Sequence, residues 1–317
     1  MGFKLVICPP NYQEDWPAKL KEAVPDIDIH LCPSVGEAMG VIGDADAAFG
    51  DIVPELFERA QNLRWIACPQ AGPRAGYYHQ ALIDSEVVVT NTREIYNDHI
   101  SAHIMAFVLA FARGLQVYIP QQTAGVWRQS DTALHLPEAS AVIVGVGGIG
   151  AETARLCSAF GITVLGVDPR LAAPPPGVAE LHRPDALDSI LPRGDFVIVT
   201  VPETPETQGM FDARRFRLMK EQAFFINIGR GATVVLDDLA EALREHQIAG
   251  AGLDVFQEEP LPSGHPLWKM PGVLLTPHVA GNGPYLQERR TELLIDNCKR
   301  FDAGLPLTNV VDKANWF

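Results

Sequence analysis

The sequence predicts an α/β protein built from two doubly wound parallel-sheet domains. Short β-branched runs alternate with segments of helical periodicity through the first hundred residues, and the alternation starts again after residue 139. Strands that alternate with helices in this way form parallel sheets covered on both faces. The chain has 317 residues, of which 47% are hydrophobic, which is enough for two domains with separate cores.

Five apolar runs in the first part of the chain are predicted strands. Any one of them is explained equally well as a coincidental apolar patch, but five in the same alternation favour one sheet. They are FKLVIC (3–8), DIDIHL (26–31), DAAF (46–49), LRWIAC (63–68) and EVVVTN (86–91). The first run carries one lysine and ends at two prolines, so we interpret it as a strand and not as a signal peptide.

Six further runs predict a second sheet of the kind that binds nucleotides. They are AVIVG (141–145), ITVLGVD (162–168), DFVIVTV (195–201), AFFINIG (223–229), AGAGLDVF (249–256) and VLLTPH (273–278). Residues 151–160 and 236–246 are predicted helices between these strands, the Pro-rich stretch 171–181 is a predicted surface loop, and 285–304 is a predicted amphipathic helix. The most apolar helix, 100–112, is shorter than the roughly 20 residues of a membrane span, so we expect it to be buried in a soluble protein.

The charge balance and the cysteines exclude several classes of protein. The formal net charge is −14, and no run of lysines or arginines is present, which argues against a nucleic-acid partner. The five cysteines are odd in number, scattered and never in a CxxC pair, which favours reduced thiols in the cytoplasm over disulfides or a metal site.

A glycine-rich motif follows the first strand of the second sheet. Gly145, Gly147 and Gly150 have GxGxxG spacing, a helix follows them, and Asp168 closes the next strand. This context is typical of a dinucleotide site, in which the glycines permit a tight turn, close approach of the pyrophosphate and helix packing. The alternative is an ordinary glycine turn of an α/β protein.

Asp168 also predicts which dinucleotide is bound. A carboxylate at this position accepts hydrogen bonds from the ribose hydroxyls and repels a 2′-phosphate, so NAD is favoured over NADP. Arg170 leaves NADP open, because a guanidinium two residues further on is within reach of a phosphate.

Four polar residues lie where strands of this sheet end, which is where ligands bind in such sheets. They are Arg230, Asp254, Glu259 and His278. Singly, each has a plain explanation as a loop cation, a solvated acid or a turn residue after a proline. Their joint occurrence in one predicted cofactor domain indicates a reacting centre.

At this point the chain resembles the D-2-hydroxyacid dehydrogenase family. The blocks GVGGIG with VDPR, VPETPETQGMF, NIGRGATV, GLDVFQEEPLP and TPHVAG match its signatures in order. The resemblance implies a Rossmann NAD-binding domain, residues 99–283, inserted into a flavodoxin-like substrate-binding domain, residues 1–98 and 284–317. It also implies a homodimer.

The resemblance assigns roles to the four polar residues. Arg230 would hold the substrate carboxylate and the 2-oxo oxygen, and His278 would protonate that oxygen as hydride arrives from the nicotinamide. Glu259 would orient His278 and favour its protonated form, and Asp254 would bind the nicotinamide carboxamide. The chain would then interconvert a small 2-oxo acid and its D-2-hydroxy acid.

Further contacts are implied by the same resemblance. Additional cofactor contacts would be Gly148, Ile149, Val201, Pro202, Ile228, Gly229, Ala280 and Gly281. Backbone N–H groups of Ala71 and Gly72 would meet the substrate carboxylate, with Arg74 beside them. This chain departs from the family here, having Pro73 and Arg74 where a valine and an aspartate are usual, and it departs again at Glu94, at Ala102 and after His278.

Two other readings stay open at this stage. The family includes corepressors that sense NAD(H) without turnover and keep the dehydrogenase residues, so this chain is alternatively a binding protein. Relatives that act on formate or phosphite use the same cofactor fold with a different environment around the histidine.

Overall fold

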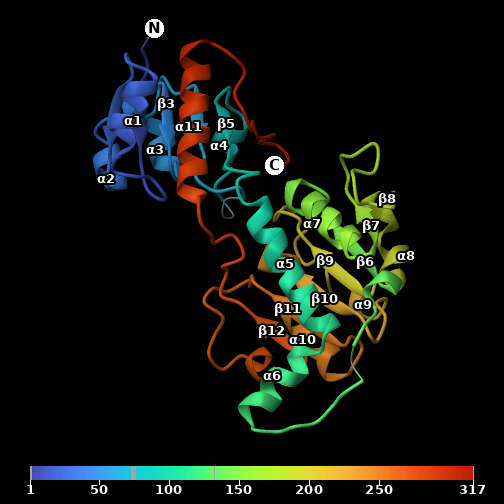
Figure 1. The fold of residues 1–317 in the computed structure, drawn as a ribbon. Coiled ribbons are helices and arrows are strands. Elements are labelled where there is room, and N and C mark those ends of the chain that lie inside the picture. The colour runs from blue at the N-terminus through green and yellow to red at the C-terminus, as the bar shows by residue number, and fades with distance from the viewer. Residues whose placement is uncertain (1, 73–75, 132, 317) are drawn as a thin grey trace. The chain divides into compact units, whose positions relative to one another are not determined.

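The computed structural model describes residues 2–72, 76–131 and 133–316. The chain divides into two compact units, which are described separately (Figure 1). The first unit is Met1–Ile95 with Pro284–Phe317, and the second is Tyr96–Gly283. The second unit is therefore inserted in the sequence of the first.

The described residues of the first unit form a five-stranded parallel sheet of order β2-β1-β3-β4-β5, the flavodoxin-like order. The strands are β1 (Lys4–Ile7), β2 (Asp28–Leu31), β3 (Ala47–Phe49), β4 (Trp65–Ala67) and β5 (Val88–Thr90). The helices are α1 (Trp16–Ala23), α2 (Val35–Ala38), α3 (Pro54–Arg59), α4 (Gln80–Ile83) and α11 (Leu286–Asp302).

Alternate residues of β1 serve two separate cores of this unit. Leu5 and Ile7 pack with α1 and α11 on one face, and Val6 packs with α2, α3 and α4 on the other. Trp16 Nε1 donates a hydrogen bond to Thr291 Oγ1 (2.7 Å), which ties α11 to the start of the chain.

The described residues of the second unit form a seven-stranded parallel sheet of order β12-β11-β10-β9-β6-β7-β8. The strands are β6 (Ser140–Val144), β7 (Thr163–Val167), β8 (Glu180–His182), β9 (Phe196–Val199), β10 (Phe224–Asn227), β11 (Gly250–Leu253) and β12 (Val273–Leu275). The direction of winding reverses between β6 and β9, which is the switch point at which doubly wound sheets bind ligands.

Helices cover both faces of this sheet (Figure 1). They are α5 (Asn97–Ala112), α7 (Gly148–Ala159), α8 (Leu187–Ile190), α9 (Ala213–Phe216) and α10 (Leu236–Arg244). Helix α6 (Leu115–Thr123) follows α5 and contacts it. The 3₁₀ segments of the chain are η1 (Ile42–Asp44), η2 (Leu136–Glu138), η3 (Pro184–Ala186), η4 (Leu191–Arg193), η5 (Gly231–Thr233) and η6 (Pro266–Lys269). Helices α5 and α7 share one core, and α8, α9 and α10 share the other.

The predicted fold class is confirmed, with one strand more than expected. Strand β8 begins inside the stretch that we predicted as a loop, residues 171–181. Its three residues, Glu180, Leu181 and His182, contain no apolar run, and they form a strand because their backbone pairs with the edge of β7. In the described residues no single helix is long and apolar enough to span a membrane; α5 and α6 meet that test only as a pair, bent by 76°.

Candidate active site and cofactor loop

The glycine loop lies between β6 and α7, at the switch point of the sheet. Gly145 has a φ of +92°, and its N–H donates to the Val167 carbonyl (2.8 Å). A Cβ on Gly150 would lie 2.0 Å from the Gly145 carbonyl oxygen, so the helix packs against the turn more closely than any side chain permits. The first N–H groups of α7 are thereby presented at the loop, as a dinucleotide pyrophosphate requires.

Asn97, the first residue of α5, lies directly over this loop. A Cβ on Gly148 would come within 2.6 Å of Asn97 Nδ2. The sequence motif gave no sign of this contact, because Asn97 stands far from the glycines in the chain. The start of α5 therefore belongs to the surroundings of the cofactor loop.

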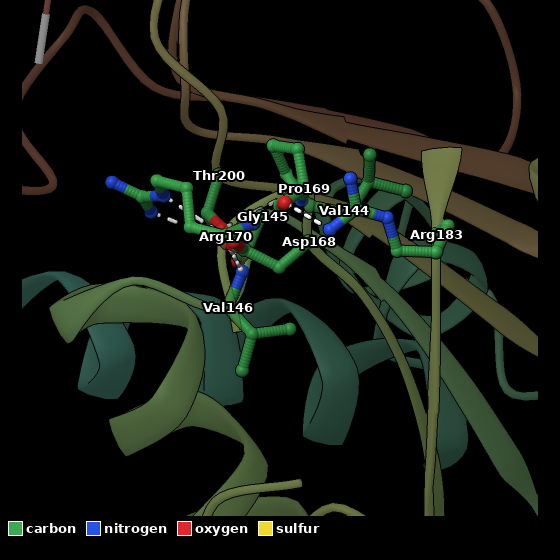
Figure 2. Close-up of polar contacts among 8 residues, drawn as sticks. All are labelled: Val144, Gly145, Val146, Asp168, Pro169, Arg170, Arg183 and Thr200. Carbon is green, nitrogen blue, oxygen red and sulfur yellow. Dashed lines mark hydrogen bonds and ion pairs between the residues drawn. The ribbon is translucent and has the colours of Figure 1, made fainter. Parts of the chain in front are cut away.

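Asp168 is folded inward at the end of β7 and is only 1% exposed (Figure 2). Its Oδ1 accepts from Arg170 N (2.8 Å) and Nε (3.3 Å), and its Oδ2 accepts from Val146 N (3.0 Å) and Arg170 Nη2 (3.2 Å). Burial alone raises the pKa of this carboxyl, but the hydrogen bonds and charge of Arg170 and the Val146 N–H outweigh it, and the pKa lies below its ordinary value of 3.8.

Arg230 stands on a loop that the side chain of Asn227 holds from beneath. Asn227 Nδ2 donates to the Arg230 carbonyl (3.0 Å), and Asn227 Oδ1 accepts from Gly229 N (3.0 Å). A Cβ on Gly231 would lie 1.9 Å from the Phe256 carbonyl carbon, so this loop also lies flat against the chain that follows β11. Asn227 was missed by sequence reasoning, although a buried amide at a strand end is a detectable signal.

The Arg230 side chain is half-buried, and its guanidinium interacts electrostatically with two carboxylates. Its Nη1 donates to the Gly229 carbonyl (2.6 Å). Burial lowers the pKa of Arg230 from its ordinary value, and the carboxylates of Glu203 and Glu259 act in the opposite direction. A guanidinium stays ionised in any protein environment, so this one is suited to binding an anion.

His278 and Glu259 form the pair that the resemblance implied. His278 Nδ1 lies 2.7 Å from Glu259 Oε2, and Glu259 Oε1 accepts from Phe256 N (2.9 Å). The side chains are 51% and 36% exposed, respectively. Because the Glu259 carboxylate occupies Nδ1, Nε2 is the ring nitrogen that remains available for proton transfer.

Asp254, which is 1% exposed, holds the segment that carries His278. Its Oδ1 accepts from Thr276 Oγ1 (2.6 Å) and Val279 N (2.9 Å), and its Oδ2 accepts from Ala280 N (2.9 Å). The His278 N–H donates to the Asp254 carbonyl (2.8 Å). These bonds fix His278 in the left-handed region, at a φ of 53°. The predicted contact of Asp254 with the nicotinamide carboxamide stays a prediction.

His103 of α5 extends this network. Its Nε2 lies 3.0 Å from Thr276 Oγ1 and 3.8 Å from Asp254 Oδ1. Since the Thr276 hydroxyl donates to Asp254, its oxygen accepts from the His103 ring. Sequence analysis missed His103, because nothing in the sequence connects it with residue 276.

The remaining predicted cofactor residues all lie in the second unit. Ile149 is on α7, and the others follow strand ends near the residues described above: Val201 and Pro202 after β9, Ile228 and Gly229 after β10, and Ala280 and Gly281 after His278. Ile228 and Ala280 are buried in the core with α5. Their predicted contacts with a dinucleotide are not tested by these positions.

The predicted substrate residues lie in the first unit. Ala71 and Gly72 follow β4, and Asn91 Nδ2 donates to the Ala71 carbonyl (2.9 Å). Pro73 and Arg74 lie outside the described residues. Among the residues that the structure describes, no group of three or more His, Cys, Asp or Glu side chains has the arrangement of a metal site.

Comparison with known proteins places this geometry in a family. The family model for the D-isomer specific 2-hydroxyacid dehydrogenase NAD-binding domain matches residues 105–280. A glyoxylate reductase from Pyrococcus furiosus is 34% identical over 274 residues, which is 82% of this chain and 79% of that protein.

Two solved structures resemble nearly the whole chain. A D-isomer specific 2-hydroxyacid dehydrogenase from Xanthobacter autotrophicus Py2, in complex with NADPH and MES, is 30% identical with a TM-score of 0.88, covering 99% of both chains. An NADPH-dependent glyoxylate/hydroxypyruvate reductase from Sinorhizobium meliloti, in complex with NADP and sulfate, is 28% identical with a TM-score of 0.84, covering 99% of this chain and 100% of that one. The chain belongs to the D-isomer specific 2-hydroxyacid dehydrogenase family, a family of oxidoreductases that act on CH–OH groups.

Proposed function

We propose that this protein is an NAD(P)H-dependent oxidoreductase that interconverts a small 2-oxo acid and its D-2-hydroxy acid. The observation that carries the proposal is the His278–Glu259 pair, at 2.7 Å, in the same unit as the glycine loop and the Arg230 loop. The names of the relatives support the same substrate class, since they include glyoxylate and glyoxylate/hydroxypyruvate reductases.

The residues of the second unit have complementary tasks in this reaction. Arg230 binds the carboxylate and the 2-oxo oxygen, which makes the carbonyl carbon more electrophilic. His278 donates its Nε2 proton to that oxygen, while Glu259 keeps the ring oriented. A bound NAD(P)H would supply the hydride from its nicotinamide, and the glycine loop and the N-terminus of α7 would hold its pyrophosphate. In the opposite direction His278 accepts the hydroxyl proton.

The first unit carries the residues that the family resemblance assigns to substrate binding. The N–H groups of Ala71 and Gly72 would bind the substrate carboxylate; Arg74, the third predicted substrate contact, lies outside the described residues. In this proposal the first unit, with boundaries near residues 98 and 284, is the substrate-binding domain and the second is the cofactor domain.

We further propose a homodimer in the cytoplasm. On α6 and directly after it, the large hydrophobic residues Leu115, Ile119, Val126 and Trp127 are exposed, Trp127 to 97%. Exposed apolar residues gathered in one segment are typical of an interface. The five cysteines are buried thiols, as expected for a reducing compartment. Light scattering of the purified protein would give the mass of a monomer if the dimer is wrong.

The preference between NAD and NADP is the finer part of the proposal. The sequence favoured NAD because Asp168 was expected to face the ribose, and two related structures contain NADPH or NADP. Both cofactors therefore belong in every assay.

The experiment is a spectrophotometric panel of glyoxylate, hydroxypyruvate, pyruvate and longer 2-oxo acids with NADH and with NADPH. We expect oxidation of the cofactor with at least one acid. Tight cofactor binding without turnover of any acid would contradict the proposal and favour a sensor. Reduction of NAD(P)⁺ by formate or phosphite alone would also contradict the proposal and would favour a formate or phosphite dehydrogenase.

A further inference from the structure

The buried side chain of Asp254 holds the segment around His278 from both sides. Its two oxygens accept from Thr276 Oγ1 (2.6 Å), Val279 N (2.9 Å) and Ala280 N (2.9 Å). One of these donors precedes His278 in the chain and two follow it. The position of the histidine therefore depends on whether all three donors stay aimed at one carboxylate.

The short distance between Thr276 and Asp254 fixes the direction of the hydrogen bonds at the threonine. Two oxygens 2.6 Å apart share a proton, and because the carboxylate is the acceptor, this proton belongs to the Thr276 hydroxyl. The threonine oxygen then offers only lone pairs to His103 Nε2, which lies 3.0 Å away. His103 Nε2 therefore carries a proton and donates to Thr276, which donates to Asp254. Hydrogen bonds in such a chain strengthen one another.

The His103 ring is held in place by its own helix and by the sheet. It packs edge-on against the Phe107 ring, one turn further along α5, with 4.9 Å between the ring centroids. A Cβ on Gly252 of β11 would lie 2.9 Å from Phe107 Cγ, so Phe107 lies directly against the sheet. An apolar ring would make the same packing contact, and what a histidine adds is the N–H directed at Thr276.

The backbone of His278 needs support of this kind. Its φ of 53° lies in the left-handed region, which is unfavourable for a residue with a Cβ and persists only where the surroundings hold it. The His278 N–H donates to the carbonyl oxygens of Asp254 (2.8 Å) and Thr276 (3.1 Å). The two residues that hold this backbone are the same two that the His103 ring connects to α5.

We propose that His103 is a positioning residue of the active site, which acts through Thr276 and Asp254 to keep His278 in the conformation needed for proton transfer. The proposal rests on the proposed function, in which His278 donates the proton. His103 touches neither substrate nor cofactor in this account. It keeps the Thr276 hydroxyl aimed at Asp254, so that the segment with the left-handed histidine has one arrangement.

The first test compares variants of His103 by steady-state kinetics. His103→Phe keeps a ring against Phe107 but removes the N–H, and we expect kcat to fall about 3- to 30-fold while cofactor affinity, measured by fluorescence titration, is unchanged. His103→Gln should recover part of the loss, because its amide also donates.

His182→Phe is the matched control for this comparison. The side chain of His182 is 24% exposed, against 22% for His103, and its Nε2 lies 3.1 Å from Glu180 Oε2 on β8, at the opposite edge of the sheet from β12. An unchanged kcat in His103→Phe, or an equal fall in His182→Phe, would overturn the proposal.

A double variant tests whether His103 acts through the threonine. Thr276→Val removes the hydroxyl and should lower kcat at least as much as His103→Phe, whereas Thr276→Ser keeps the hydroxyl and should keep most of the activity. Adding His103→Phe to Thr276→Val should cause no further loss, because the chain of hydrogen bonds is already broken. Losses that multiply in the double variant would overturn this route.

Nuclear magnetic resonance of the full chain with ¹⁵N-labelled histidine needs no turnover. The ring signals of His103 and His278 are identified by their absence from variants at these positions. We expect a proton on His103 Nε2 at neutral pH, and His278 signals that shift in Thr276→Val and His103→Phe but not in His182→Phe. A His103 Nε2 without a proton, or His278 signals that do not shift, would overturn the proposal. If no 2-oxo acid is reduced, the proposed function fails while this measurement still decides whether His103 positions His278.

Discussion

Asp168 and Asp254 are alike in residue type, in burial and in position after a strand of the same sheet, yet their partners differ. Asp254 accepts hydrogen bonds from a threonine hydroxyl and two backbone N–H groups, and His103 Nε2 lies 3.8 Å from its Oδ1. Asp168 accepts two hydrogen bonds from backbone N–H groups and two from the guanidinium of Arg170. The first carboxylate fixes the segment that carries His278, whereas the second forms an ion pair with Arg170 and holds that side chain. The role of an acidic residue at a strand end therefore depends on which hydrogen-bond donors the fold places around it.

The largest expected effect is on kcat, and it follows from replacing His278, whose chain segment Asp254 holds in place. Replacing His278 with alanine should lower kcat by about 10²–10⁴-fold, because the proton donor is lost while the cofactor loop is untouched. Steady-state kinetics and fluorescence titration with NAD(P)H measure the two properties separately. His135→Ala, at an exposed histidine of the same unit, is the control. Loss of cofactor affinity in His278→Ala would show a structural role instead.

The next effect separates the two aspartates directly. An asparagine at position 254 presents one donor where the carboxylate accepted, and a buried N–H or hydroxyl left unsatisfied costs about 1–3 kcal/mol. We expect Asp254→Asn to lower kcat by about 10- to 100-fold at saturating cofactor with an unchanged circular dichroism spectrum. Asp168→Asn should leave kcat at saturating cofactor nearly unchanged. Equal losses in both variants would remove the distinction between the two sites.

Much of this architecture follows from sequence patterns, and the exceptions have a common cause. The alternation of strands and helices predicted both parallel sheets, and the glycine spacing correctly predicted the turn before α7. Strand β8 was missed because its pairing with β7 is a backbone interaction that its composition does not reveal. The pair of Glu259 and His278 was implied by the family resemblance, and the two side chains lie 2.7 Å apart.

What the sequence did not predict is which hydrogen-bond donor pairs with which acceptor in the site. Asp168 has the residue type of a ribose ligand, and only the folded turn shows that Arg170 bends back onto it. His103 lies beside Thr276 only because packing brings together residues 173 positions apart in the chain. Donors and acceptors in a sequence do not determine which of them meet, because many pairings satisfy the same pattern.

The smallest expected effect is on stability and its dependence on pH. The pKa of Asp168 in the folded protein lies below its ordinary value of 3.8, so its ionised form stabilises the fold fully above that pH. Asp168→Asn should therefore unfold with a free energy about 1 kcal/mol lower at neutral pH. The difference should shrink as the pH falls from 3.8 through the lower folded pKa, where the wild-type carboxyl takes up its proton.

Urea unfolding of both proteins at pH 7, 5 and 3.5, followed by circular dichroism, checks this dependence. A difference that grows on acidification would mean that Asp168 is not held as a carboxylate by Arg170 and Val146.

The central claim is that His278, Glu259 and Arg230 reduce a 2-oxo acid with defined stereochemistry. The most direct measurement is chiral chromatography of the product formed from hydroxypyruvate and NAD(P)H. The account predicts D-glycerate in an amount equal to the cofactor oxidised. Formation of L-glycerate, or cofactor oxidation without glycerate, would contradict it.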